Sequence, residues 1–251
     1  MATRQERERD KKTSLLAAAE QVFTRKGYAD ATLDEIIKLA DTGKGTVYRY
    51  FGNKENLFYQ LVLAKHQALM KDLWELARRQ DCSVPDKLRL LSSRWLHFLS
   101  DNKVLWPVVG NEMTGINKGV VGDVQPDGTY RECIRWGSAP PPDKLEQMLR
   151  YQRIMNEETE PIAAVYREGL EQGLFRTSAQ HQDIAVHLFF SMAMVLFIHP
   201  DPDRILNAGG GPISTLDQLA DNIITHFLYG MIDPKKREEM ERRDHIRYPE
   251  V

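Results

Sequence analysis

The sequence predicts an all-α protein. Apolar residues recur every three or four positions through most of the 251-residue chain, which is the spacing of one face of a helix. Capping residues and glycines mark where these stretches begin and end. No stretch shows the alternation of apolar and polar residues that a half-buried strand requires. The length suits a small domain followed by a larger one, and we expect these two domains to span residues 1–53 and 54–251.

The first expected helix runs from Arg7 to Lys26, and Gly27 follows its last turn as a C-cap. A second helix begins at Thr32, a good N-cap residue whose capping-box partner is Glu35, three positions on. The apolar positions of the second helix are Leu33, Ile36, Ile37 and Ala40.

A turn over residues 41–43 leads to a third helix, and we expect Gly43 to supply the backbone freedom of that turn. The third helix has Val47 and Phe51 four positions apart on one face. A helix this short needs a neighbour to be stable. Its opposite face carries cations, aromatic rings and hydroxyls: Lys44, Thr46, Tyr48, Arg49 and Tyr50. Two short helices of this build are typical of a helix-turn-helix, whose second helix enters the DNA major groove.

Longer helices follow this motif. One begins at the N-cap Asn53 and ends near Arg79, and another begins at Pro85. Residues 114–142 are rich in glycine and proline and lack helical periodicity. We expect them to form a long irregular excursion, and a loop of that length is usually functional or mobile.

The C-terminal part predicts three more helices. The first spans about residues 143–172 and contains Pro161, a position for a kink or a break. Residues 179–199 are apolar on nearly all sides, which predicts a fully buried helix. The last helix is expected to begin at Ser214 as its N-cap.

A wider set of residues surrounds the helix-turn-helix, namely Phe23, Gly27, Tyr28, Ala31, Thr32, Leu33, Ile36, Ala40, the run from Lys44 to Phe51, Lys54 and Glu55. Over roughly residues 12–60 this pattern resembles the DNA-binding domain of TetR-type transcriptional regulators. Two positions depart from the family pattern. Asp41 stands where the family commonly has glycine, and Gly43 stands where it has serine or threonine. Gly43 lacks the hydroxyl that would contact a phosphate, and the neighbouring Thr42 is the candidate substitute.

The resemblance implies that the exposed face contacts operator DNA. Thr46 and Arg49 would face bases, and Gly45 would let the helix approach the groove closely. Phosphate contacts are implied for Thr32, Lys44, Tyr48 and Lys54. The full set of implied DNA-binding residues is Thr32, Thr42, Lys44, Gly45, Thr46, Tyr48, Arg49, Tyr50 and Lys54.

The distribution of charge supports this orientation. The net charge is −2, but residues 1–54 hold 11 Lys/Arg against 8 Asp/Glu, so this segment is positive and the remainder is negative. A basic head on an acidic body would direct one end toward a phosphate backbone. The charged N-terminus lacks the apolar core of a signal peptide, and no apolar run reaches the length of a membrane span. We therefore expect a cytoplasmic protein.

The sequence offers no motif for catalysis or metal binding. Residues 43–46, Gly-Lys-Gly-Thr, fail the phosphate-binding loop pattern because Gly45 follows Lys44 where Ser or Thr is required. The seven His show no ligand spacing, and Cys82 and Cys133 have no nearby partner. We expect no cofactor, no metal and no enzymatic activity.

The resemblance further implies a homodimer and a small, hydrophobic ligand in the larger domain. The interface would be a four-helix arrangement of the apolar helix and the last helix from each subunit, with Phe189, Phe190, Ile223 and Phe227. The alternative for the apolar helix is an ordinary domain core. Candidate ligand-binding residues are the large side chains of the central helices and the excursion, each of which taken singly is more often core: Trp95, Phe98, Trp106, Met113, Trp136, Tyr151, Met155 and Tyr166.

The function expected from these features is a ligand-responsive transcriptional regulator, most simply a repressor, that binds a near-palindromic operator as a homodimer. A helical binding or scaffold protein that has lost DNA binding is the alternative, and an all-α enzyme is a more distant one. A gel shift with the protein's own upstream DNA discriminates the first two.

Overall fold

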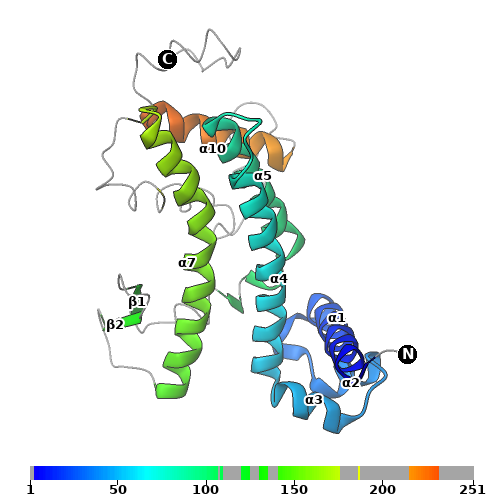
Figure 1. Cartoon of the computed structure of the whole chain (residues 1–251). Coiled ribbons are helices and arrows are strands. Elements are labelled where there is room, and N and C mark those ends of the chain that lie inside the picture. The colour runs from blue at the N-terminus through cyan, green and yellow to red at the C-terminus, as the bar shows by residue number, and fades with distance from the viewer. Residues whose placement is uncertain are drawn as a thin grey trace. The chain divides into compact units, whose positions relative to one another are not determined.

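The computed structural model describes residues 3–106, 108–109, 120–124, 130–134, 141–175, 186 and 215–231. Helices dominate this part of the chain, as the sequence predicts, and they carry the labels of Figure 1. The elements are α1 (Arg4–Asp30), α2 (Leu33–Leu39), α3 (Lys44–Phe51), α4 (Lys54–Ala77), α5 (Val84–Asp101), β1 (Val120–Val124), β2 (Tyr130–Ile134), α7 (Pro142–Glu171) and α10 (Leu216–Met231).

α1 begins after Thr3, whose hydroxyl accepts a hydrogen bond from the Glu6 amide at 3.2 Å. The helix is interrupted at Gly27, where φ is 77° and ψ is 167°. Glycine adopts such a positive φ without steric cost, so Gly27 ends the regular part of α1, as predicted. The buried face of this helix consists of Leu15, Ala18, Ala19, Val22 and Phe23.

The turn between α2 and α3 differs from the expectation in its backbone. Gly43 has an ordinary extended conformation, with φ −78° and ψ 145°. Asp41 instead has a positive φ, 47°. Aspartate tolerates the left-handed region better than most residues because its short side chain can hydrogen-bond locally. The prediction that Gly43 supplies the conformational freedom is therefore wrong, and Asp41, where the resembling family commonly has glycine, does so.

The N-cap expected for α4 is confirmed, and the N-cap expected for α10 is wrong by one residue. Asn53 precedes α4 and its Oδ1 accepts a hydrogen bond from the Asn56 amide at 2.7 Å, as expected of an N-cap. At α10 the capping hydroxyl belongs to Thr215, whose Oγ1 accepts from the Gln218 amide at 3.2 Å. The expected cap at Ser214 is one residue early, and Ser214 itself lies outside the described residues.

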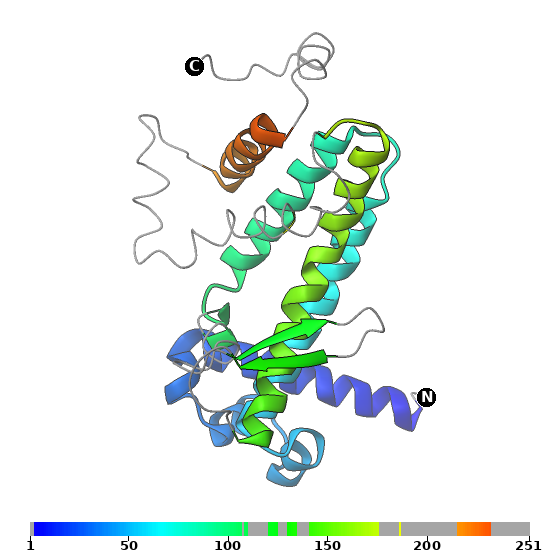
Figure 2. The ribbon, with the colours of Figure 1, turned by 90° about the vertical axis from the view of Figure 1, so that its left-hand side faces the viewer.

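Residues 114–142 are not wholly irregular. Their described residues form β1 and β2, an antiparallel pair in which Val120 faces Ile134 and Val124 faces Tyr130, and Figure 2 shows the two strands as neighbouring arrows. The expectation of a wholly irregular excursion is wrong for this hairpin, whereas the all-α fold class is confirmed. Its strands are only five residues long, too short for the alternation of residue types to stand out from the surrounding glycines and prolines.

Contacts divide the chain into two compact units, residues 1–68 with 102–154 and residues 69–101 with 155–251. In the first unit, α2 and α3 lie beside α1 near the start of α4 (Figure 1). An aromatic cluster joins α1 to α4: the Phe58 ring centroid lies 5.4 Å from that of Phe23 and 4.8 Å from that of Tyr28. This cluster holds α1 on α4.

The second unit packs α10 on α5, which run beside each other in Figure 2. The C-terminal part of α7 completes this unit through two polar pairs with α5. The indole Nε1 of Trp95 donates to Oε2 of the fully buried Glu158 at 3.0 Å. The ammonium of the buried Lys87 lies 2.6 Å from Glu168 Oε2. A buried charge needs such a partner to offset its desolvation.

Helix α7 continues through Pro161, so the break left open by the sequence is absent there. Proline removes one helical hydrogen bond. Residues on both sides of Pro161 are buried, namely Glu158 before it and Ile162 and Val165 after it, and their packing offsets this loss. No helix in the described ranges combines the length and apolar character needed to cross a membrane.

Candidate nucleic-acid interface

The helix-turn-helix is anchored by apolar side chains that point into the first unit. Val47 and Phe51 of α3 are 1% and 2% exposed, and Ile36 of α2 is fully buried. A free eight-residue helix would not hold its shape in water. Burial of one face against its neighbours therefore fixes which residues of α3 point outward.

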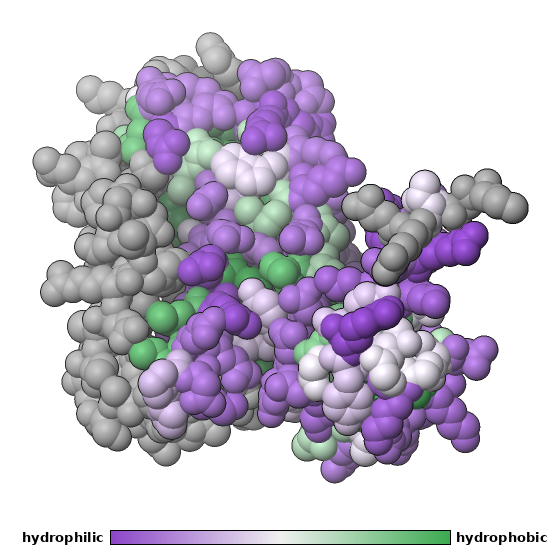
Figure 3. Space-filling model, turned by 60° about the horizontal axis from the view of Figure 1, so that its bottom comes forward, coloured by the Kyte–Doolittle hydropathy of each residue, from purple (hydrophilic) through white to green (hydrophobic). Residues whose placement is uncertain are grey.

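The outward face of α3 is the one that the sequence predicts. Lys44, Gly45, Tyr48 and Arg49 are exposed, and Thr46 and Tyr50 are half-buried. Tyr48 keeps 47% of its surface exposed, which is unusual for a large ring. In Figure 3 the region over α1–α3 is covered mainly by hydrophilic and intermediate residues. The structure thus brings cations, hydroxyls and an aromatic ring together on one solvent-facing surface.

The two cations of α3 have partners on the surface of the same motif. Lys44 Nζ lies 3.3 Å from Oδ1 of Asp34 on α2, and both side chains are well exposed. Arg49 Nη2 donates to the Tyr50 hydroxyl at 3.1 Å, with its guanidinium carbon 4.9 Å from the ring centroid. Exposed ion pairs contribute little stability. Both cations can therefore exchange these partners for DNA at small cost.

Thr32 is bound to its own helix. Its Oγ1 accepts from the Glu35 amide at 3.3 Å, and its backbone amide donates to Glu35 Oε2 at 3.3 Å, which completes the predicted capping box. The Thr32 hydroxyl also donates to Glu35 Oε2 at 3.1 Å. Lys26 of α1 also pairs with Glu35. Hydrogen bonds from Lys26 and Thr32 lower the pKa of Glu35 below its ordinary value. The pair with Lys26 ties α2 to α1 and was not apparent from the sequence.

Lys54 has different surroundings from the other cations of the predicted site. It is half-buried, and its Nζ lies 3.0, 3.2 and 3.0 Å from the backbone carbonyl oxygens of Tyr28, Ala29 and Ala31. The same nitrogen lies 4.7 Å from the centroid of the Tyr28 ring. Sequence reasoning missed this arrangement because the partners are backbone atoms more than twenty positions away.

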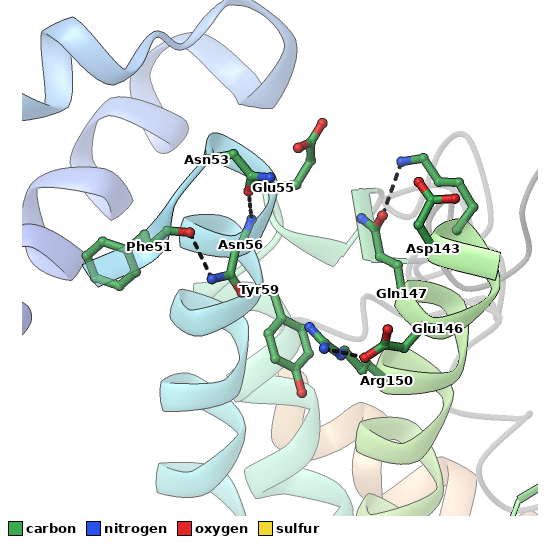
Figure 4. Close-up of a pocket in the computed structure, with 10 residues that line it drawn as sticks. Phe51, Asn53, Glu55, Asn56, Tyr59, Asp143, Glu146, Gln147 and Arg150 are labelled. Carbon is green, nitrogen blue, oxygen red and sulfur yellow. Dashed lines mark hydrogen bonds and ion pairs between the residues drawn. The ribbon is translucent and has the colours of Figure 1, made fainter. Parts of the chain in front are cut away.

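A cavity of about 470 Å³ adjoins the end of α3, the start of α4 and the first turns of α7 (Figure 4). Both signs of charge are present in its wall, and Arg150 pairs there with Glu146 while its guanidinium lies 5.6 Å from the Tyr59 ring centroid. Such a wall differs from the mostly apolar lining of typical small-molecule sites. The lining residues are Phe51, Asn53, Glu55, Asn56, Tyr59, Asp143, Lys144, Glu146, Gln147 and Arg150.

None of the predicted ligand-binding residues lines that cavity. In the second unit Trp95, Phe98, Met155 and Tyr166 are buried, and Tyr166 stacks on Phe175 with centroids 4.5 Å apart. In the first unit Trp106 and Tyr151 are also buried, and Tyr151 packs edge-on against Tyr59. In this structure all six belong to packed cores. Met113 and Trp136 lie outside the described residues.

Two of the predicted interface residues are already covered within one chain. Ile223 and Phe227 of α10 are buried, and the Phe227 ring centroid lies 6.4 Å from that of Tyr166. The neighbouring positions Asp221, Asn222 and His226 form the exposed side of this helix. The other two predicted residues, Phe189 and Phe190, fall outside the described residues.

Comparison with known proteins identifies the family. Residues 15–61, which contain the helix-turn-helix, match the model of the bacterial regulatory proteins of the tetR family. The HTH-type transcriptional repressor SCO4008 of Streptomyces coelicolor is 28% identical over 212 residues, covering 84% of this chain and 90% of that protein. The segment of residues 15–61 is therefore a DNA-binding domain of the TetR type. The resemblance inferred from the sequence is thus confirmed.

Other similarities of the chain are more local or more distant. The uncharacterized HTH-type transcriptional regulator YhgD of Bacillus subtilis is 48% identical over 52 residues, and the match spans only 27% of its length. The solved transcriptional regulator FadR of Bacillus subtilis in complex with stearoyl-CoA shares the fold, with a TM-score of 0.61 at 18% identity, covering 87% of this chain and 98% of that one. These relatives are named as transcriptional regulators and not as enzymes, in agreement with the prediction.

Proposed function

We propose that this protein is a ligand-responsive repressor of the TetR type that binds a near-palindromic operator as a homodimer. The observation that carries the proposal is the outward face of α3, where exposed Lys44, Tyr48 and Arg49 lie opposite the buried Val47 and Phe51. A short helix that is held by one face and presents cations and hydroxyls on the other is suited to the major groove.

The proposed contacts divide into two kinds. Arg49 and Thr46 read base edges, because guanidinium and hydroxyl groups on the exposed side of α3 reach the groove floor. Lys44, Tyr48 and Tyr50 face the phosphates on either side. Gly45, which has open space where a Cβ would stand, keeps the helix close to the bases. Thr32 and Thr42 contribute hydroxyls near the N-termini of α2 and α3.

Residues 1–53 form the DNA-binding domain in this proposal, and residues 54–251 form the ligand-binding and dimerisation domain. Two identical domains related by a two-fold axis read two half-sites, so the operator repeats as a near-palindrome. The second copy packs on the segment of residues 179–199 and on α10. A repressor of this kind acts on the chromosome and therefore works in the cytoplasm.

The ligand is a small hydrophobic molecule held by the larger domain. The proposal follows the family resemblance, which implies such a ligand, and apolar ligand surface needs a largely apolar lining. FadR binds stearoyl-CoA, although that likeness concerns only the fold. The ligand must bind the DNA-incompetent state more tightly to release the operator. By reciprocity, operator DNA weakens ligand binding by the same factor.

The test is a fluorescence anisotropy titration of a labelled duplex from the protein's own upstream region, repeated at several salt concentrations. Each phosphate neutralised adds about 0.9 to the log-log salt slope, so the proposed dimer gives a steep slope. The stoichiometry should be two chains per duplex. Affinity that does not change between low and moderate salt contradicts the proposal.

A further inference from the structure

We infer that Lys54 is a positioning residue, whose ammonium group ties the end of α1 to the start of α4 and thereby sets the place of the helix-turn-helix between them. This inference rests on the proposed function, in which α3 reads DNA. It departs from the phosphate contact that the family resemblance implies for Lys54.

The geometry assigns every donor of the ammonium group. A lysine ammonium has three N–H bonds, and Lys54 Nζ has three carbonyl oxygens within 3.2 Å, those of Tyr28, Ala29 and Ala31. The Tyr28 ring covers the same nitrogen at 4.7 Å, a distance at which a cation and an aromatic face attract each other. A phosphate could be bound only after at least one carbonyl is released.

The carbonyls need such a partner. The regular part of α1 ends at Gly27, and carbonyl groups near a helix end have no partner within the helix. A cation there also stabilises the negative end of the helix dipole. The turn that follows Gly27, residues 28–30, contains no basic residue of its own. Lys54 supplies a cation to this turn from another helix.

The contact closes the helix-turn-helix at both ends. Ala31 is buried and directly precedes Thr32, the N-cap of α2. Lys54 stands three positions after Phe51, the last residue of α3. The hydrogen bond from Lys54 to Ala31 therefore joins the two ends of the segment that contains α2 and α3. Loss of this contact should loosen the whole segment and misplace α3.

Lys44 provides the matched contrast. It lies on the same motif and carries the same charge, but its side chain is exposed and its ionic partner, Asp34, is exposed too. A cation of that kind can contact phosphate at little cost. Removing the charge of Lys54 should therefore alter both the DNA-free protein and its affinity for DNA, whereas removing the charge of Lys44 should alter only the affinity.

The first experiment uses the unmodified protein without DNA. Acetylation by a water-soluble amine-reactive ester is followed at each lysine by mass spectrometry. Lys44 should react about tenfold faster than Lys54 or more, because the ammonium of Lys54 must leave three acceptors and lose a proton before it can react. Equal rates at the two lysines overturn the inference, whether or not the protein binds DNA.

The second experiment compares Lys54→Met, which keeps the aliphatic stem, with Lys44→Met. Hydrogen exchange of the DNA-free proteins should become faster over residues 28–51 in Lys54→Met only. Affinity for the own-upstream duplex should then fall about tenfold at every salt concentration with an unchanged salt slope. Lys44→Met should instead lower the slope by about 0.9 per chain.

A lower salt slope in Lys54→Met, together with unchanged hydrogen exchange over residues 28–51, would show that Lys54 contacts a phosphate and would overturn the inference. If unmodified protein binds no DNA at any salt concentration, the proposed function fails. The acetylation rates and the exchange of residues 28–51 still decide whether Lys54 fixes this segment.

Discussion

At the residue scale, Asp41 determines the turn of the helix-turn-helix. Its positive φ of 47° is the only such value at a residue other than glycine among the described parts of the chain. A β-branched side chain in that region meets the backbone. The turn therefore constrains which residues position 41 accepts, although the side chain is exposed.

Asp41→Val should destabilise the protein by about 1–2 kcal/mol, because valine cannot hydrogen-bond locally to offset the left-handed conformation. Urea unfolding followed by circular dichroism measures this change. Asp41→Gly is the matched control, since it also removes the carboxylate but accepts a positive φ, and it should stay within about 1 kcal/mol of the unmodified protein. Equal losses in both variants would assign the effect to the carboxylate.

A substitution at Gly45 should change stability and DNA binding in opposite directions. A Cβ there meets nothing within 4 Å, and alanine is favoured over glycine inside a helix by about 1 kcal/mol. Gly45→Ala should therefore raise the unfolding free energy by up to that amount. It should also weaken DNA binding, because the added methyl lies between α3 and the groove. Urea unfolding and anisotropy titration check the two effects, and tighter DNA binding would show that Gly45 does not face the groove.

At the element scale, α2 depends on ionised Glu35. Lys26, then Thr32, hold the pKa of this carboxyl below its ordinary value. A group whose pKa is lower in the folded state stabilises the fold above its unfolded pKa, and this contribution is lost as pH falls through the folded pKa. The capping box of α2 should thus weaken in acid, below about pH 4.5.

Glu35→Gln should reduce the loss of stability on acidification between about pH 5 and pH 3, since glutamine does not titrate. Urea unfolding at a series of pH values gives the comparison. Asp34→Asn serves as the control on the same helix, because the exposed Asp34 has only an exposed partner. A pH dependence in Glu35→Gln that equals that of the unmodified protein would contradict a role for this carboxylate.

The sequence predicted those elements whose signals are local. The N-caps Thr32 and Asn53 each accept a hydrogen bond from an amide three positions on. A pattern within one helical turn of sequence is therefore enough to predict where α2 and α4 begin. The buried pair Val47 and Phe51 likewise follows from helical spacing. The exposed face of α3 is the complement of that pair.

Features that depend on distant parts of the chain could not be read in this way. Lys54 donates to the carbonyls of Tyr28, Ala29 and Ala31, and the type of a residue gives no information about the partners of its backbone atoms. The aromatic residues proposed for a ligand pocket show the same limit. Trp95 and Tyr166 pack into a core, and whether a large ring fills a core or lines a cavity depends on its neighbours in space.

At the scale of the whole molecule, the apolar face of α10 is buried within its own chain. The buried side chains Ile223 and Phe227 face inward, and Phe227 meets Tyr166 of α7. The exposed positions of α10 are mainly polar. A second copy that packs on α10 would therefore meet polar residues there, and the apolar part of the proposed interface would come from residues 179–199.

Phe227→Asp should lower stability by about 3 kcal/mol or more, because it removes a buried ring and buries a carboxylate without a partner. Asn222→Asp, at an exposed position of α10, is the control and should change stability by about 0.5 kcal/mol or less. Calorimetry measures unfolding, and light scattering measures mass. A folded monomer from Phe227→Asp would show that this ring belongs to the subunit interface.

The central claim is that α3 reads DNA sequence. The most direct measurement is the ratio of affinities for the own-upstream duplex and a scrambled duplex, determined at one salt concentration for the unmodified protein and for Arg49→Ala. The unmodified protein should prefer its own sequence, and loss of a base contact worth about 1–3 kcal/mol should reduce that preference by roughly tenfold or more. An unchanged ratio in Arg49→Ala, or no preference in the unmodified protein, would contradict the account.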